Sequence, residues 1–357
     1  MAALRYFFSL LMIPVSFMVA GAGVMAFLAA WVSPAQSGLV TRAGLVMPAI
    51  LLANLGVAIY WIFSKKWWVL LPSAIILLNI GYLTSIFQFN FSAPTVPSGT
   101  TLIRIASYNV GNFRSWAKQD TYHPIAFLFK EQQINIACFQ EYAERPNLSP
   151  DSLSQLLGLP YHAVEYLKDS KTNGSAIYSK FPILRQGRLP FVSTANDAMW
   201  ADLQIDSQII RVISCHLETT SFNRKRQELK TTDLEKASTE QLAMIYNDIS
   251  STLVDRSATR AAQADLVRQL IDTTSFPVLV CGDFNDPPSS YTYHRIKGPL
   301  KDSFRSRGKG YGYTFRGLHR LFRIDYILYS GQFQCLEYES EDLPWSDHKP
   351  IICILSL

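Results

Sequence analysis

"PVLVCGDFND", residues 277–286, changes character halfway along its length. Its first half is apolar and β-branched, which is typical of a strand in the core. Asp283 and Asn285 follow at the point where such a strand would leave the core. Polar groups there are costly unless they are hydrogen-bonded. The stretch therefore predicts a core strand whose end delivers polar side chains to a site.

The same change from apolar to polar residues recurs along the second part of the chain. We expect strands in LIRIASYNV, NIACFQE, GSAIYS, RVISCHLE, PVLVCGDFN, RIDYILYS and KPIICILSL, at 102–110, 135–141, 174–179, 211–218, 277–285, 323–330 and 349–357. Polar residues end several of these runs or begin the last two, namely Asn109, Glu141, His216, Asp283, Asn285, Asp325, Asp347 and His348. If the last two strands run antiparallel to the others, all these groups lie along one edge of the sheets.

Each of these residues has a simpler explanation when taken alone. Asn109 and Asn285 fit turns, Glu141 fits a surface position at a strand end, and His216 fits a buried histidine with a partner. The recurrence of acidic, amide and imidazole groups at strand ends favours one shared site. Carboxylate and amide oxygens suit Mg²⁺, Mn²⁺ or Ca²⁺, and two histidines can move protons near neutral pH.

Other catalytic signatures are missing from the sequence. There is no G-x-S-x-G nucleophile elbow, no P-loop and no G-x-G-x-x-G after a strand. The remaining polar set fits metal-assisted attack of water on a phosphoester.

In order along the chain, YNV, FQE, SCHLE, GDFND, RIDYIL and SDHKP resemble the signature of the endonuclease/exonuclease/phosphatase superfamily, whose fold is like that of deoxyribonuclease I. The resemblance covers residues 101–357. It implies an α/β four-layer sandwich, in which two packed, mixed or antiparallel sheets are flanked by helices.

The resemblance also implies a role for each motif residue. Glu141 and Asn109, with Asp347, would hold a divalent metal, usually Mg²⁺. Asp283 would orient or deprotonate the attacking water, and Asn285 would position the phosphate. His348, held by Asp325, would stabilise the transition state. His216 would donate a hydrogen bond to a phosphate oxygen or to the leaving group.

Three long apolar stretches come before this domain, at 6–32, 44–63 and 67–89. Each approaches or exceeds the ~20 residues that cross a bilayer as a helix. The first is too long for the apolar core of a cleaved signal peptide and has two companions. We therefore expect an integral membrane protein with a three-helix transmembrane anchor (1–89), a linker (90–100) and a catalytic domain (101–357).

Charge predicts how the anchor is oriented. Arg5, Lys65 and Lys66 would share one side of the membrane and Arg42 the other, which favours a cytoplasmic N-terminus and an extracytoplasmic catalytic domain. Residues 1–99 hold 4 of the 33 basic residues and none of the 28 acidic ones, so 29 basic residues remain beyond them. The catalytic domain is thus nearly neutral, unlike most non-specific nucleic-acid binders.

A domain held at a bilayer meets lipid headgroups at high effective concentration. We therefore favour a lipid or lipid-linked phosphoester as the substrate. A membrane-tethered nuclease acting on DNA or RNA is the alternative, and a non-catalytic binding module is a third reading. The sequence indicates the bilayer as a partner and no protein partner.

Two further features need an interpretation. The five cysteines, Cys138, Cys215, Cys281, Cys335 and Cys353, have no C-x-x-C spacing, so we expect small core residues rather than disulfides or zinc ligands. RAAQADLVRQLI (260–271) has helical spacing. The charged stretch 222–254 before it is more than a crossover needs, and it fits a lid, a membrane-facing arm or a solvated helix without a role.

Overall fold

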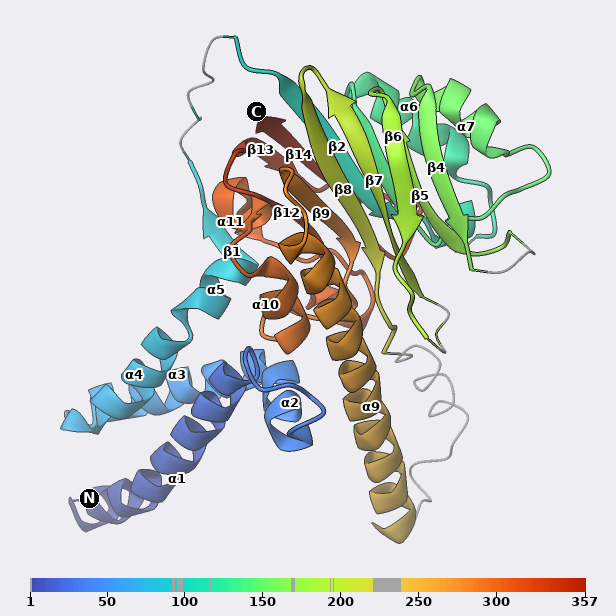
Figure 1. The fold of residues 1–357 in the computed structure, drawn as a ribbon. Helices are drawn as coiled ribbons and strands as arrows, with labels where there is room; N and C mark the ends of the chain where they lie inside the picture. Colours follow the sequence, from blue (N-terminus) through green and yellow to red (C-terminus); the bar gives the residue numbers. More distant parts are fainter. Residues whose placement is uncertain are drawn as a thin grey trace.

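Two six-stranded sheets pack face to face in the second part of the chain (Figure 1). In this computed structural model, residues 2–91, 94, 99–115, 117–167, 171–192, 194, 196–220 and 239–357 are described. One sheet has the order β10 (Lys301–Asp302), β12 (Asp325–Tyr329), β9 (Val278–Asp283), β8 (Gln208–His216), β7 (Asp197–Ile205) and β6 (Ile183–Arg188). The other has the order β13 (Gln334–Glu339), β14 (Ile351–Ser356), β2 (Leu102–Asn109), β3 (Ile136–Gln140), β5 (Gly174–Ser179) and β4 (Tyr161–Tyr166).

Both sheets are mixed. The pairs β2–β3 and β8–β9 are parallel, and the remaining neighbours in the two sheets are antiparallel. The sequence-based expectation that the last two runs are antiparallel to their neighbours is confirmed. In the register, Asp325 of β12 lies opposite Asp283 of β9.

The position of β9 in the fold explains why its first four residues are all apolar. Leu279 and Cys281 face the core between the sheets, whereas Val278 and Val280 pack under helices on the outer face. Successive strand residues point to opposite faces, so a strand covered on both sides needs apolar residues at every position. Gly282 is required here, because a Cβ on it would lie 2.0 Å from the carbonyl oxygen of Cys215.

Helices cover both outer faces. Helices α6 (Tyr122–Glu131) and α7 (Pro150–Leu157) pack on the β2–β3 sheet, and α9 (Thr239–Asp272) and α10 (Tyr291–Lys297) pack on the β8–β9 sheet. The short helix α11 (Ser303–Arg307) lies beside β13 and β12. The predicted α/β sandwich of two mixed sheets flanked by helices is confirmed, as is the burial of all five unpaired cysteines.

The N-terminal helices form a separate bundle beside this sandwich (Figure 1). They are α1 (Ala2–Leu28), α2 (Gly38–Leu45), α3 (Met47–Phe63), a 3₁₀ turn at Trp67–Val69, α4 (Leu70–Leu78) and α5 (Ile80–Ile86). One helix, spanning Tyr6–Leu28, is long and apolar enough to cross a membrane. Two more spans are possible if each bent pair of helices, α2 with α3 and the 67–78 segment with α5, counts as one.

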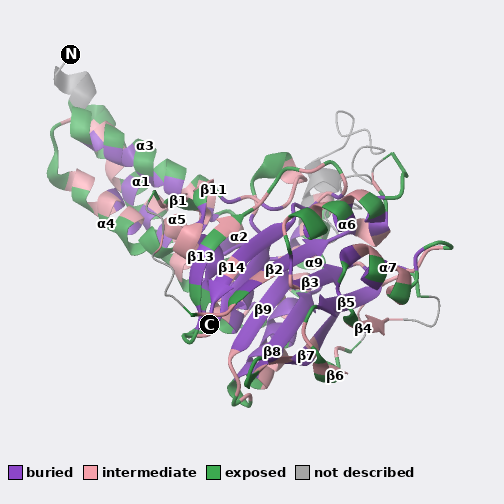
Figure 2. Ribbon diagram, turned by 90° about the horizontal axis from the view of Figure 1, so that it is seen from above, coloured by how far each residue is buried: buried purple, intermediate pink, exposed green. Residues whose placement is uncertain are grey.

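Many residues on the outside of the bundle are exposed (Figure 2), and large apolar side chains are prominent among them. Leu52 and Phe63 are 68% and 83% exposed, whereas Asn54 and Asn79 are buried. The two asparagine amides donate to the backbone carbonyls of Val19 (3.2 Å) and Gly23 (3.3 Å) on α1. Buried polar contacts between helices with apolar outer surfaces are typical of membrane bundles.

The boundary of the bundle differs from the expected one. Residues 87–89 do not extend the third apolar helix. They form strand β1 (Phe87–Phe89), which pairs with β11 (Lys309–Tyr311). Alternating phenylalanines suit a strand better than a helix end. The chain therefore contacts the sandwich before the expected linker, most of which lies outside the described residues.

Helix α9 accounts for part of the expected insertion. Residues 239–254 extend the predicted helix at 260–271 without a break, and residues 222–238 lie outside the described chain. Val254 packs beside Gly38 at the start of α2. The insertion thus contacts the N-terminal helices.

Candidate active site

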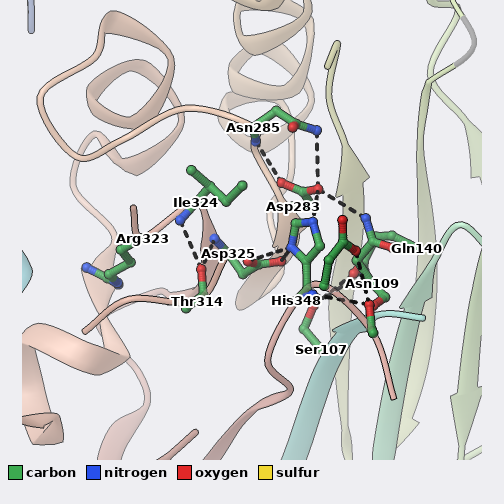
Figure 3. Close-up of polar contacts among 12 residues, drawn as sticks. Ser107, Asn109, Gln140, Asp283, Asn285, Thr314, Arg323, Ile324, Asp325 and His348 are labelled. Atoms are coloured by element: carbon green, nitrogen blue, oxygen red, sulfur yellow. Dashed lines mark hydrogen bonds and ion pairs between the residues drawn. The ribbon is translucent and has the colours of Figure 1, made fainter. Parts of the chain in front are cut away.

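The polar residues at the strand ends converge on one edge of the two sheets (Figure 3). Asn109 ends β2 and Glu141 follows β3, and these strands are parallel neighbours. His216 and Asp283 end the parallel pair β8 and β9 and are register partners. Parallel strands of equal register place their last residues side by side. The fold therefore brings together groups that lie far apart in the sequence.

Asp283 is at the centre of the hydrogen-bond network. One of its carboxylate oxygens, Oδ2, accepts from the amides of Asn109 (3.1 Å) and Asn285 (3.2 Å), and the other accepts from the Asn285 backbone N–H (2.8 Å). The side chain is buried, and Oδ2 lies 3.6 Å from Nε2 of His348. Burial raises the pKa of Asp283 to about 6, against the lowering effect of His348.

His348 lies between two carboxylates. Its Nδ1 is 3.0 and 3.1 Å from the two oxygens of Asp325, and its Nε2 faces Asp283. Burial alone would lower the pKa of this imidazole. The carboxylates of Asp325 and Asp283 outweigh that effect and hold the pKa of His348 well above its ordinary value. Asp325 is fixed in turn, because its backbone N–H donates to Oγ1 of Thr314 (3.0 Å).

Glu141 faces the opening of the site. Its Oε1 accepts from the Asn109 amide (3.1 Å) and lies 3.7 Å from Nε2 of His216. Its side chain is 34% exposed, whereas Asn109 is buried. Glu141 and Asn285 have positive φ angles of 51° and 53°, a conformation that non-glycine residues adopt at a cost. Such strain is frequent where a fold must aim a side chain.

Asp347 borders the site without joining this network. Its carboxylate lies 3.4 Å from Oγ of Ser346, which donates to the Asn109 carbonyl at 2.7 Å. Among the described contacts, Asp347 forms no hydrogen bond with Asn109 or Glu141. The structure thus joins seven of the eight predicted residues in one network and places the eighth at its rim.

The donor set fits a divalent cation. The site gathers the four carboxylates of Glu141, Asp283, Asp325 and Asp347; Asp283 and Asp325 flank His348, and Glu141 faces His216. Within the described residues, no lysine or arginine pairs with any of the four. Such an excess of negative charge, half of it on buried groups, favours a bound cation, and oxygen ligands suit Mg²⁺, Mn²⁺ or Ca²⁺. Asp283, Asp325 and His348 also lie close enough to bind a metal, but their mutual contacts already use these atoms.

Six of the eight predicted residues line a cavity of about 370 Å³. Its polar side consists of Glu141, His216, Asp283, Asn285, Asp347 and His348, and the rest of its lining is mainly apolar. The cavity therefore combines the polar network with an apolar wall.

Three supporting residues were not expected from the sequence. Thr314 accepts hydrogen bonds that fix the start of β12, and Ser346 ties the end of β2 to the loop before β14. Asp197 is buried opposite His216 on the neighbouring strand β7. Ser346 is the first residue of the SDHKP motif, which is a usable signal. No sequence signal marks Thr314 or Asp197, because only contacts between distant segments bring them to the site.

Residues 106–348, more than half of the chain, match the family described as Endonuclease/Exonuclease/phosphatase family. Residues 7–86 match a second family, described as a domain of unknown function. No match was found among curated proteins.

Several solved structures have a similar fold. An endonuclease/exonuclease/phosphatase from Beutenbergia cavernae aligns with a TM-score of 0.51, 17% identity and 72% coverage of each chain. The mannosyl-6-phosphatase Bt3783 of Bacteroides thetaiotaomicron aligns with a TM-score of 0.51 and 17% identity, over 71% of this chain and 100% of its own. A humanized TDP2 from D. rerio aligns with a TM-score of 0.50 and 15% identity, over 72% of this chain and 99% of its own. These identities establish the fold alone. Together with the sequence match, they show that the chain belongs to the endonuclease/exonuclease/phosphatase family, whose members are metal-dependent phosphoric ester hydrolases.

Proposed function

We propose that this chain is a membrane-anchored phosphodiesterase that hydrolyses a lipid or lipid-linked phosphoester with a divalent metal, Mg²⁺ being favoured. One observation carries the proposal: the catalytic cavity adjoins a helical bundle whose outer surface is apolar. The cavity lining includes Leu45 and Val46 of that bundle. A hydrolytic centre built beside membrane helices is suited to phosphoesters at a bilayer surface.

The chain's own residues provide the proton transfers. Asp283 accepts a proton from the attacking water, and its raised pKa makes it a better base than an exposed aspartate. As the water oxygen bonds to phosphorus, the bond to the leaving oxygen breaks. His348, kept protonated by Asp325, donates a hydrogen bond to the negative charge that develops on the phosphate.

Two further residues position the phosphoester. His216 donates a hydrogen bond to a phosphate oxygen or to the leaving group. Asn285 positions the phosphate, and its backbone N–H and side-chain amide also hold Asp283 in place. Glu141 and Asn109, with Asp347 at the rim, would hold the metal. When bound, the metal polarises the phosphoryl oxygen and offsets the excess of carboxylates.

We infer three spans, formed by α1, α3 and the 67–86 segment. The carbonyl of Gly44 in the first connection accepts a hydrogen bond from Ser289 of the sandwich (2.8 Å). That contact supports placing this connection and the sandwich on one side of the membrane. The N-terminus and the turn at Lys65 then share the other side. With the charge bias of the sequence, this arrangement favours an extracytoplasmic catalytic domain.

A nuclease is the competing assignment, since the family fold alone does not choose the substrate. Among the described residues, those that line the cavity include no lysine or arginine. Proteins that track a nucleic-acid backbone normally use such residues, and salt weakens their binding steeply.

The test presents purified full-length protein with mixed-phospholipid vesicles and with supercoiled plasmid in separate reactions containing Mg²⁺. We expect water-soluble phosphate compounds to be released from the vesicles and the plasmid to stay intact. Plasmid nicking without lipid turnover, weakened steeply between 50 and 200 mM salt, would make the protein a membrane-tethered nuclease instead.

A further inference from the structure

The wall of the catalytic cavity opposite the polar network is apolar. It is built by Leu45 and Val46 from the α2–α3 junction, Leu253 from α9, and Phe315, Phe322 and Ile324 from the segment that leads into β12. Three separate parts of the chain therefore contribute to one apolar surface. The ring of Phe315 lies 5.1 Å from that of His348, so this surface begins directly beside the catalytic imidazole.

The contribution of the N-terminal helices is fixed by specific contacts. Oγ of Ser289, which is buried, donates to the carbonyl of Gly44 at 2.8 Å. Ser289 lies four residues beyond Asn285, so this bond ties the bundle to the catalytic loop. Gly44 also packs against Ala29 so closely that a Cβ would lie 2.5 Å from the alanine side chain. Leu45 and Val46 are therefore held at the cavity.

The break between α2 and α3 exposes these side chains to the cavity. The two helices bend by 70° at Val46, and Val46 is 53% exposed although it is apolar. The bend thus turns part of a membrane helix toward the catalytic centre.

The chemistry of the cavity selects its occupant. A polyanion is disfavoured, because carboxylates line the polar side and, in the part of the chain that the structure describes, no lysine or arginine lines either side. Beyond Val46, α3 carries the outward apolar residues Leu52 and Leu55, which are 68% and 47% exposed. A hydrocarbon chain that entered from the bilayer would remain in apolar surroundings up to the phosphate.

We propose that Leu45 and Val46 are specificity-determining residues that contact the hydrocarbon part of an amphiphilic phosphoester while its phosphate lies in the polar network. The proposal rests on the proposed function and deepens it. The N-terminal helices then complete the substrate site as well as anchor the enzyme. The substrate is one whose hydrocarbon begins within a few atoms of the scissile phosphate.

The experiment compares two substrates in three forms of the full-length protein. The forms are wild type, the double variant Leu45→Ser/Val46→Ser, and the control Leu77→Ser, which alters an exposed apolar residue of α4 that does not line the cavity. The substrates are vesicles of mixed phospholipids and the water-soluble diester bis(p-nitrophenyl) phosphate. We expect the double variant to lose at least ~10-fold in kcat/KM on lipid and less than ~2-fold on the soluble diester, because only the lipid uses the apolar wall. The control should match wild type on both.

The outcomes separate the two proposals. A wild-type protein that cleaves the soluble diester but no lipid contradicts the proposed substrate class. A double variant that cleaves lipid at the wild-type rate contradicts only the role of Leu45 and Val46.

A double variant that loses both activities is resolved by a labelling measurement. Val46→Cys in an Asp283→Ala background introduces an accessible thiol beside five buried native ones. We expect dihexanoyl phospholipids to slow its alkylation by N-ethylmaleimide and glycerol 3-phosphate to have no effect. Equal rates with and without the phospholipids would overturn the proposal.

Discussion

Asp325 and His348 form a buried carboxylate–imidazole pair, with Nδ1 of the histidine 3.0 and 3.1 Å from the two carboxylate oxygens. The pair joins the start of β12 to the loop before β14, so each sheet supplies one partner. Its geometry leaves Nε2 facing Asp283. The contact between the sheets therefore also sets the orientation of the catalytic imidazole.

Asp325→Asn tests the electrostatic part of this relationship. Asp325 is the main group that raises the pKa of His348 above the level set by burial. Its removal lowers that pKa, so the imidazolium is lost at lower pH. We expect kcat to fall by ~100-fold near neutral pH, and the alkaline limb of the pH–rate profile to move to lower pH.

The matched control is Asp265→Asn. It removes a carboxylate of α9 that forms an exposed pair with Arg295 of α10. It should leave the profile unchanged. An Asp325→Asn protein whose alkaline limb coincides with that of wild type would show that Asp325 does not tune His348.

His294 links stability to pH where the two parts of the chain meet. Its ring lies 5.5 Å from that of Trp31, just beyond α1. Burial, with a smaller contribution from Lys297, lowers the pKa of His294 from 6.5 to about 4. The unfolded protein therefore binds this proton first as the pH falls. Native stability should decline between about pH 6.5 and 4, by at most about 3 kcal/mol from this group.

The measurement compares the melting temperatures of wild type and His294→Gln in detergent between pH 7 and 4.5. Other groups titrate in that range, so the difference between the proteins is the informative quantity. The account predicts that wild type loses stability relative to the variant on acidification. A constant difference would contradict it.

Arg323 joins the N-terminal bundle to the strand that carries Asp325. Its guanidinium pairs with Asp302 at 2.5 Å and donates to the carbonyl of Ser85 at 2.8 Å, and both charged residues are buried. Arg323→Met leaves the Asp302 carboxylate buried without its cation. We expect a loss of about 3–5 kcal/mol in the free energy of unfolding.

Arg185→Met is the matched comparison for that variant. Arg185 is 60% exposed and pairs with Asp202, which keeps its second partner Arg211. Its loss should cost about 1 kcal/mol or less. Equal destabilisation by the two substitutions in denaturant unfolding would refute the special role of Arg323.

The membrane orientation is testable with reporter fusions. Alkaline phosphatase joined after Leu357 should be active in a bacterial host, because the reporter folds only outside the cytoplasm. The same reporter joined after Lys66 should be inactive, since that turn lies on the cytoplasmic side in our assignment. The opposite pattern would invert the topology, and activity of both fusions would contradict three spans.

Much of the catalytic edge could be predicted from the sequence. Strand β9 is apolar at each position up to Cys281, and it ends in Asp283 because the chain leaves the core there. The same local rule located Asn109, His216 and Asp325. Among the strands of the two six-stranded sheets, it failed for β4, β6, β7, β10 and β13, which were not expected. Strand β6 is an exposed edge strand with polar residues, and so it lacks the apolar run of a core strand.

The contacts between distant segments could not be predicted from the local sequence. Nothing in the sequence near Thr314 marks it as the acceptor for the backbone N–H of Asp325. The stretch 44–63 looked like one helix, although Pro48 near the start of α3 was a signal for a helix beginning there. The break at Val46 matters because Ser289 holds the preceding residues against the sandwich. That bond exists only in the folded chain.

The most direct test of the account is the initial rate at which the full-length protein releases water-soluble phosphate compounds from mixed-phospholipid vesicles in Mg²⁺, compared with Asp283→Ala. Folding of the variant is verified by its melting temperature. The account predicts release that requires the metal and falls by at least ~100-fold in the variant, the loss expected when a central group of the reaction is removed. Equal release by the two proteins, or a fall of less than ~5-fold, would contradict it.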